Sequence, residues 1–114
     1  MKLFTTEEIR AIDRATIDGE AVSPLELIER VGEGVASEIA TRWRSNKPTI
    51  VFAGPGNNGA DALAAARLLW ERGFRPDVYL FNIGGDKLSA DCAALRDRLL
   101  REIPEIQFCD CLLY

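Results

Sequence analysis

The chain has 114 residues, of which 47% are hydrophobic and 28% are charged, so it suits one small globular domain and not a disordered segment. Its 14 Lys and Arg residues are scattered and its formal net charge is −4, which gives a nucleic-acid backbone no electrostatic attraction. The absence of histidine removes the usual general base of Ser and Cys nucleophiles and argues against a structural zinc site.

A pair of helices is expected over residues 1–46. The first begins at Thr6 and ends near Gly19, with apolar residues at helical spacing. The second begins where Ser23 provides an N-cap and Pro24 the first helical residue, and Glu26 completes a capping box. Its apolar stripe, which should face the core, consists of Leu25, Ile28, Val31, Val35, Ile39 and Trp43.

Strands and helices alternate over the rest of the chain. The first of these strands is so continuously apolar that we expect it to be buried on both faces. The helix that follows it should end at Gly73, a residue suited to a left-handed cap. In chain order, the expected elements are a strand (48–53), a helix (58–72), a strand (77–82), a helix (89–102) and a strand (103–108).

This alternation predicts an α/β protein whose parallel strands are joined by right-handed crossovers, with helices on the sheet faces. The expected fold is a Rossmann-like three-layer α/β/α sandwich, of which residues 1–114 hold one partial domain with about the first three strands. The expected strand order is 3-2-1, so the first strand lies at an edge. Chain beyond Tyr114, another subunit or the two amino-terminal helices would cover that edge.

A glycine-rich turn connects the first strand to the next helix. Gly54, Gly56 and Gly59 have the spacing G-x-G-x-x-G at the carboxyl end of a strand, where open α/β sheets bind ligands. Backbone N–H groups in such a turn can bind a pyrophosphate, helped by the helix dipole. The dinucleotide-binding form also needs an acid at the end of the second strand, and Asn82 stands there instead, so binding of ordinary NAD is not predicted.

The same turn carries three polar side chains. Asn57 and Asn58 can offer amide oxygens to a cation or amide nitrogens to a phosphate, and Asp61 adds one carboxylate. So weakly charged a set suits a monovalent ion or a phosphate better than Mg²⁺ or Ca²⁺. Asn and Asp also cap helices without any ligand, and Gly and Pro punctuate any turn, so from local chemistry both interpretations stay open.

Residues 54–61, with the sequence GPGNNGAD, resemble the G-x-G-N-N-G-G-D-G loop of the YjeF N-terminal domain family, known as NAD(P)HX epimerase or NAD(P)H-hydrate epimerase. The resemblance covers most of residues 5–108 and extends to EEIRAIDRATID, SPLELIERVGEGVASEIA and ALAAARLLWERGFRPDVYLF. Ala60 and Ala62 depart from the family's usual glycines and would add methyl groups where the backbone approaches the ligand. Arg30 also replaces the asparagine of the usual E-N-A-G.

This resemblance implies an enzyme, an isomerase that interconverts the R and S epimers of hydrated NADH or NADPH. It implies that Asn58 ligates potassium, with one K⁺ per subunit in a site that is incomplete in this chain. Asp61, the only carboxylate of the loop, is the candidate for catalytic proton transfer or positioning. The hydrated nucleotide would be bound by Gly54, Gly56, Asn57, Asn58, Gly59, Ala60 and Asp61.

The family is often dimeric, and bacterial members are often fused to a dehydratase, so a homodimer or an associated dehydratase domain is expected. No apolar run approaches the roughly 18–20 residues that cross a bilayer, and the acidic start differs from a secretory signal, so we expect a cytoplasmic protein with no membrane partner. Cys92, Cys109 and Cys111 contain no Cys-x-x-Cys pair and are expected to be small apolar residues near the core or a chain end.

Two other functions stay open. A relative of this domain in messenger-RNA decapping scaffolds serves dimerisation and RNA contact without catalysis, although the acidic composition here argues against it. The family's fourth strand and the aspartate that completes its potassium site would fall beyond Tyr114, so we expect the native protein to continue. The chain would then be an inactive fragment of a bifunctional epimerase/dehydratase, or an active part of it.

Overall fold

The computed structural model describes residues 23–83 and 88–113, and the fold is given for these ranges. The expected helix near Thr6 and the GGD segment after the second strand lie outside them. The described elements are α2 (Pro24–Arg42), β1 (Ile50–Ala53), α3 (Asn57–Glu71), β2 (Asp77–Ile83), α4 (Ala90–Glu102) and β3 (Gln107–Leu113).

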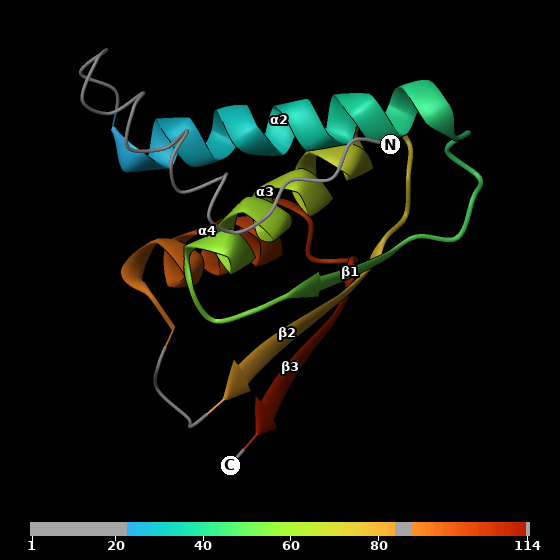
Figure 1. Cartoon of the computed structure of the whole chain (residues 1–114). Helices are drawn as coiled ribbons and strands as arrows, with labels where there is room; N and C mark the ends of the chain where they lie inside the picture. The colour runs from blue at the N-terminus through green and yellow to red at the C-terminus, as the bar shows by residue number, and fades with distance from the viewer. Residues whose placement is uncertain (1–22, 84–87, 114) are drawn as a thin grey trace.

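The strands form a parallel sheet in the order β1-β2-β3, with β1 at an edge as predicted (Figure 1). Ala53 pairs with Leu80, and Leu80 pairs with Asp110. Both crossovers step across the sheet in the same direction, so their right-handedness places α3 and α4 on the same face. Helix α2 packs against α3 on this side of the sheet. The prediction of a parallel α/β fold is confirmed.

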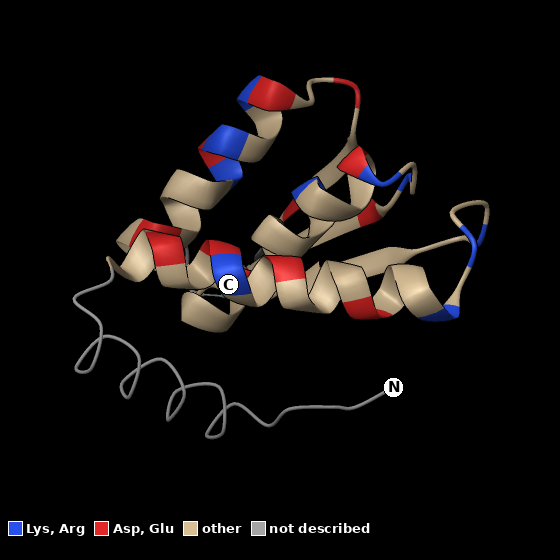
Figure 2. Cartoon of the chain, turned by 90° about the horizontal axis from the view of Figure 1, so that it is seen from above, with Lys and Arg blue, Asp and Glu red and all other residues tan. Residues whose placement is uncertain are grey.

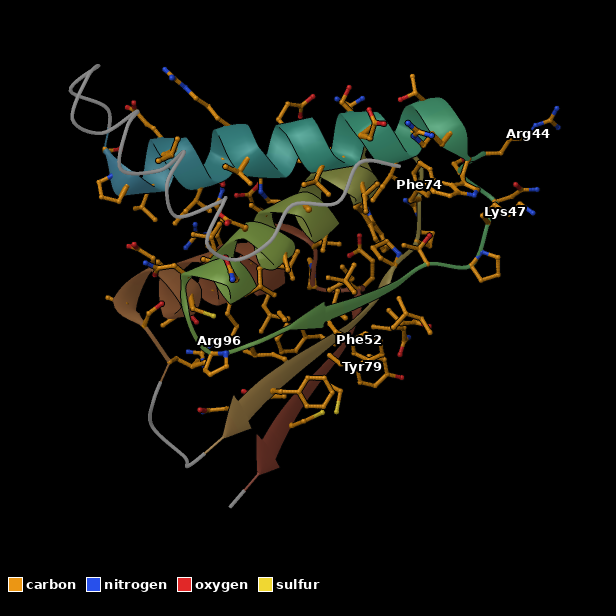
Figure 3. All side chains as sticks on the ribbon, in the orientation of Figure 1. Arg44, Lys47, Phe52, Phe74, Tyr79 and Arg96 are labelled. Carbon is orange, nitrogen blue, oxygen red and sulfur yellow. The ribbon has the colours of Figure 1, made fainter. Side chains whose placement is uncertain are left out.

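No helix of the described residues covers the other face of the sheet. Ile50 and Phe52 of β1 are 57% and 64% exposed, and the Phe52 ring lies beside Tyr79, with 5.7 Å between the ring centroids (Figure 3). The prediction that the first strand is buried on both faces is therefore wrong, because the two crossovers place their helices on one face only. Of the expected two helical layers, the described residues contain one.

The core lies between the sheet and α3. Leu63 of α3 is fully buried, and it shares one apolar cluster with Val78 and Leu80 of β2 and Leu99 of α4. Helix α3 ends as predicted, with Gly73 at a φ of +91° and Phe74 N–H donating to Leu69 C=O at 3.1 Å. No helix in the described ranges has both the length and the apolarity to cross a membrane.

Two details of the third strand and of α2 differ from the predictions. Strand β3 begins at Gln107, after a turn closed by a 3.2 Å hydrogen bond from Ile106 N–H to Ile103 C=O, so the strand predicted over 103–108 is misplaced. Ile103 and Ile106 are buried as turn residues and not as strand residues. Helix α2 starts at Pro24 with Ser23 as its N-cap, as predicted. Its buried residues, however, are Leu27, Ile28, Gly32 and Ala36.

Small residues set how closely α2 approaches α3. A Cβ on Gly32 would lie 2.8 Å from the Ala64 Cβ and 3.1 Å from backbone atoms of α3. Leu25, Val35 and Trp43, three members of the predicted stripe, remain 43%, 38% and 42% exposed. Ile28 of the same stripe is buried and Ile39 packs against the core, so the predicted face is correct for these two residues. The rest of the buried face is formed by Leu27, Gly32 and Ala36, two of them small residues.

Two glycines of α2 provide a matched test of this contact. We expect Gly32→Ala to destabilise the fold by about 1–2 kcal/mol, because overpacking outweighs the gain in helix propensity. Gly34 has no atom within 4 Å of an added Cβ, so Gly34→Ala should stabilise the same helix by about 0.5–1 kcal/mol. Urea unfolding followed by circular dichroism measures both. Equal effects of the two substitutions would contradict the close α2–α3 contact.

An ionic cluster joins the three helices at one end of this layer. Arg67 of α3, 5% exposed, forms ion pairs with Glu29 of α2 and with Glu71, the latter at 3.2 Å. Arg98 of α4 pairs with Glu29 at 2.9 Å and with Glu102 at 2.6 Å. The hydrogen bond from Arg98 holds the pKa of Glu102 below its ordinary value of 4.5, so the stabilisation from this group is lost as the pH falls through its lowered pKa.

Candidate functional site

The glycine-rich turn lies where the carboxyl end of β1 meets the amino end of α3. Gly56 is the N-cap of α3 and makes no side-chain capping hydrogen bond. Its carbonyl accepts from the N–H groups of Gly59 and Ala60 at 3.0 and 3.3 Å. Neither asparagine nor Asp61 is the N-cap residue, so the ligand-free capping interpretation does not describe this helix. The partial positive charge of the helix terminus therefore faces the turn without a capping side chain.

The structure requires glycine at one of the three glycine positions of the turn but not at the other two. A Cβ on Gly59 would lie 1.7 Å from the carbonyl oxygen of Gly54, so the approach of α3 to the end of β1 requires glycine there. Around Gly54 and Gly56 an added Cβ would meet no atom within 4 Å. Neither has a positive φ, and Gly56 has a φ of −94°. Close packing therefore requires glycine at Gly59, whereas neither packing nor backbone strain requires glycine at Gly54 or Gly56.

The polar residues of the turn lie at increasing depth. Asn57 is exposed, Asn58 is half-buried, and Asp61, one turn into α3, is 7% exposed. Asn58 and Asp61 are three residues apart and so share one side of the helix. Ala60 is fully buried in the apolar core, and half-buried Ala62 packs against it. Both methyl groups therefore have packing partners in the core, and the expected effect of these alanines on a ligand stays a prediction.

Two residues of the α4 region hold the turn in place, and the sequence analysis assigned neither to the site. Ser89, the N-cap of α4, donates its backbone N–H to the Pro55 carbonyl at 2.9 Å. The Cys92 thiol lies 3.6 Å from the Gly54 carbonyl oxygen, and burial raises the pKa of this thiol. The serine was recognisable from sequence as a helix start, but no local pattern indicates which loop it contacts.

Asn82 reaches the same edge of the sheet from β2. It lies on the helix-covered face, two residues beyond Leu80, the partner of Ala53. Asn82 is 6% exposed, and its Oδ1 accepts no hydrogen bond within the structure. A buried carboxamide oxygen of this kind is costly unless water or a ligand donates to it. The end of the second strand, singled out in the sequence, therefore does lie beside the turn.

The site offers a cation few charged ligands. In the ranges 23–83 and 88–113, no three residues among His, Cys, Asp and Glu are grouped so as to hold a metal ion. The side-chain oxygen donors on the turn are the amides of Asn57 and Asn58 and the carboxylate of Asp61, and the last two share one helix side. This donor set fits a weakly bound monovalent cation and not a tight divalent site.

A parallel sheet with a glycine-rich turn at its carboxyl edge and an uncapped helix behind it defines a Rossmann-like α/β domain. Over residues 24–104 the chain matches the family described as YjeF-related protein N-terminus, and it belongs to that family. The resemblance found in the sequence is thereby confirmed.

Two of the curated relatives that the chain matches have names that refer to NAD(P)H hydrate. The NAD(P)H-hydrate epimerase of Rhodobacter capsulatus is 36% identical over 107 residues, which cover 88% of this chain and 50% of that protein. The bifunctional NAD(P)H-hydrate repair enzyme Nnr of Coxiella burnetii is 36% identical over 78 residues, which cover 68% of this chain and 16% of that protein. The chain thus spans about half the length of the epimerase named first.

One solved structure has the same fold. The crystal structure of yeast ynu0 superposes with a TM-score of 0.68 at 24% sequence identity, covering 96% of this chain and 47% of the yeast chain. At this identity the likeness establishes the fold alone. In fold, this chain therefore corresponds to about half of the yeast chain.

Proposed function

We propose that this chain is the nucleotide-binding part of an NAD(P)H-hydrate epimerase, an isomerase that interconverts the R and S forms of hydrated NADH and NADPH. The names of its relatives support this activity. The single observation that carries it is the bareness of Gly54 and Gly56, which the fold does not require, at the uncapped start of α3. A nucleotide pyrophosphate approaching the backbone there accounts for both glycines.

In this proposal the turn binds the anionic part of the substrate. Backbone N–H groups at the start of α3 and the exposed amide of Asn57 donate to phosphate oxygens, and the helix dipole adds to the attraction. The packing of Gly59 against Gly54, together with the Ser89 to Pro55 hydrogen bond, fixes the turn before the substrate arrives. Such preorganisation lowers the entropic cost of binding.

Epimerisation requires loss of the hydroxyl group from one face of the nicotinamide ring and return of water from the other. The leaving oxygen needs a proton donor, and the incoming water needs to be positioned. We assign proton transfer or positioning to Asp61, because it is the carboxylate of the turn and lies on the same helix side as Asn58. At 7% exposure it is shielded from bulk solvent, which favours proton transfer to a bound group over exchange with water.

The potassium ion belongs to this proposal. Asn58 would provide one neutral oxygen, and further ligands would have to come from elsewhere. When bound, K⁺ would supply positive charge close to the substrate phosphates. One ion per subunit, in a site that this chain completes only in part, agrees with the small donor set of the turn.

We further propose that the chain acts in the cytoplasm, where NADH and NADPH are used, as a homodimer or together with a dehydratase. The dehydratase association is supported by relatives named as bifunctional repair enzymes. Nucleic acid is not among the proposed partners. Figure 2 shows acidic and basic residues interspersed along the helices, without a continuous basic surface on the described part of the chain.

The test is a chromatographic assay of epimer ratio. The purified chain is incubated with S-NADHX or R-NADHX, with and without K⁺, and we expect faster approach to the equilibrium ratio than in buffer, with a further increase in K⁺. Gly56→Ala should reduce nucleotide affinity at least about tenfold, or 1.4 kcal/mol. Gly34→Ala is the matched control, because Gly34 is an exposed residue of α2 outside the turn. This substitution should not change nucleotide affinity.

A second readout separates binding from catalysis. Bound substrate raises the unfolding temperature of the native chain by mass action. A ligand-dependent increase without epimerisation would support nucleotide binding and reject catalysis by this chain alone. The proposal would be overturned if the chain showed no epimerisation and no ligand-dependent increase in unfolding temperature. Equal nucleotide affinity of the wild type and Gly56→Ala would also overturn it.

A further inference from the structure

Two cysteines lie together on β3. The Sγ atoms of Cys109 and Cys111 are 3.1 Å apart, and neither residue forms a disulfide. Being two residues apart in a strand, their side chains share one face, and their register partners on β2 are Tyr79 and Phe81. This is the face of the sheet that no described helix covers. Cys109 is exposed and Cys111 is half-buried, so solvent reaches the pair.

Packing does not explain this pair. Cys92, the third cysteine, is fully buried in the core and behaves as the predicted small apolar residue. Cys109 and Cys111 lie near the end of the chain, as the prediction also allowed, but they are exposed and half-buried and do not fill the core. The two sulfur atoms lie close enough to contact one another, and no apolar cluster of the described residues includes either side chain.

The geometry decides between a disulfide and a bridging ion. A disulfide requires about 2.05 Å between the sulfurs and Cα atoms within about 6.8 Å, and two residues of an extended strand already span about 6.6–6.8 Å. The backbone is thus at the limit of the range that a disulfide allows. A tetrahedral ion with two metal–sulfur bonds of about 2.3 Å separates the sulfurs by about 3.7 Å. Side-chain rotation alone provides that small opening from 3.1 Å.

We propose that Cys109 and Cys111 chelate one thiophilic divalent cation, such as Zn²⁺ or Cd²⁺, through both sulfur atoms. Thiolates are the ligands that such ions prefer. Among the described residues no third His, Cys, Asp or Glu joins the pair in a metal-binding group, and the proposed site takes water in its remaining coordination positions. The site is therefore an exchangeable one, unlike a closed structural zinc site.

The acidic residue between the cysteines belongs to the other face. Asp110 alternates with them along β3, and its Oδ2 lies 4.0 Å from a guanidinium nitrogen of Arg96 on α4. Two sulfur ligands and no carboxylate make the site selective for soft ions over Mg²⁺ or Ca²⁺. The proposal is independent of the nucleotide site, because none of these residues belongs to the turn at the start of α3.

Cadmium titration of the reduced chain tests the proposal. Thiolate-to-cadmium charge transfer gives an ultraviolet absorption band, and we expect it to saturate at one Cd²⁺ per chain. Cys109→Ser and Cys111→Ser should each weaken binding at least about tenfold, because each leaves a single thiol. The double variant retains Cys92, so its residual signal measures any contribution of that buried thiol. Circular dichroism should show that all three variants remain folded, since the substituted side chains lie outside the core.

The outcomes are distinct. Saturation at one ion per chain, lost in both single variants, supports the dithiol site. Unchanged binding in either single variant would show that one thiol suffices, and unchanged binding in the double variant would place the ion elsewhere. One Cd²⁺ shared by two chains in analytical ultracentrifugation would replace a chelate within one chain by a bridge between copies. Each of these last three results overturns the proposal.

Discussion

Replacing Gly59 with alanine is expected to destabilise the fold by about 3 kcal/mol or more, at the upper end of what overpacking costs. The added Cβ would lie 1.7 Å from the Gly54 carbonyl oxygen and 2.8 Å from its carbonyl carbon. Both are backbone atoms, so no side-chain rotation relieves the clash. The end of β1 and the start of α3 would have to separate, and the Gly54–Cys92 contact would open with them.

Gly56→Ala is the matched control within the same turn. Its Cβ would meet no atom within 4 Å, so the free energy of unfolding should fall only by the cost of alanine in place of glycine at an N-cap, about 0.5–1 kcal/mol. Urea unfolding curves of the two variants and the wild type provide the comparison. A Gly59→Ala protein as stable as Gly56→Ala would show that α3 does not approach β1 as described. The pair also separates fold from function, because Gly56→Ala should lose nucleotide affinity while keeping most of its stability.

Arg67→Ala is expected to cost about 3 kcal/mol, the lower end of the range for breaking a buried ion pair. The arginine is 5% exposed and joins α3 to Glu29 of α2, so its removal leaves a cavity and takes from Glu29 one of its two cations, the other being Arg98. The side chains of Glu29, Glu71 and Glu102 are 27%, 58% and 39% exposed. Their remaining contact with water places the cost at the lower end of the range.

Arg67→Met separates the charge of this residue from its bulk. Methionine fills most of the volume of the arginine stem without its charge, so we expect a loss of only about 1–2 kcal/mol. The measurement is the urea midpoint at constant slope, since a changed slope would report a change in the denatured state. If methionine were as costly as alanine, the ion pairs and not the packing would account for the whole effect. If alanine cost less than about 1 kcal/mol, the cluster would not stabilise the fold.

Local signals in the sequence were enough for the element order, the parallel sheet and the position of the turn. The Ser23 cap, the left-handed Gly73 and the glycine spacing after β1 each depend on a few neighbouring residues, and each lies where it was predicted. Pairing of each strand with the next one in the chain gives the strand order, and right-handed crossovers then place both helices on one face. The ligand of the site could not be predicted in the same way. The fold brings the site residues to one edge of the sheet, but no pattern among these residues specifies what they bind.

The predictions that failed all depended on contacts between distant segments. Whether β1 has one buried face or two depends on which side both crossovers take, and its apolar run does not contain that information. The buried side of α2 is set by Gly32 meeting Ala64, a contact between small residues that a search for bulky apolar residues overlooks. The four-residue spacing of Gly32 and Ala36 was the sequence signal that could have indicated this buried side. The exposure of Cys109 likewise follows from its place on the sheet face that no described helix covers.

The uncovered side of the sheet determines how this chain must be handled in solution. Phe52 lies within 6 Å of the ring centres of both Tyr79 and Phe81, which gives that side a contiguous aromatic surface. Surfaces of this kind attract hydrophobic dyes, detergents and chaperones, and they draw identical molecules together as the protein is concentrated. Assays on the chain therefore belong in a dilution series, so that self-association is separated from the chemistry of the opposite, helix-covered side.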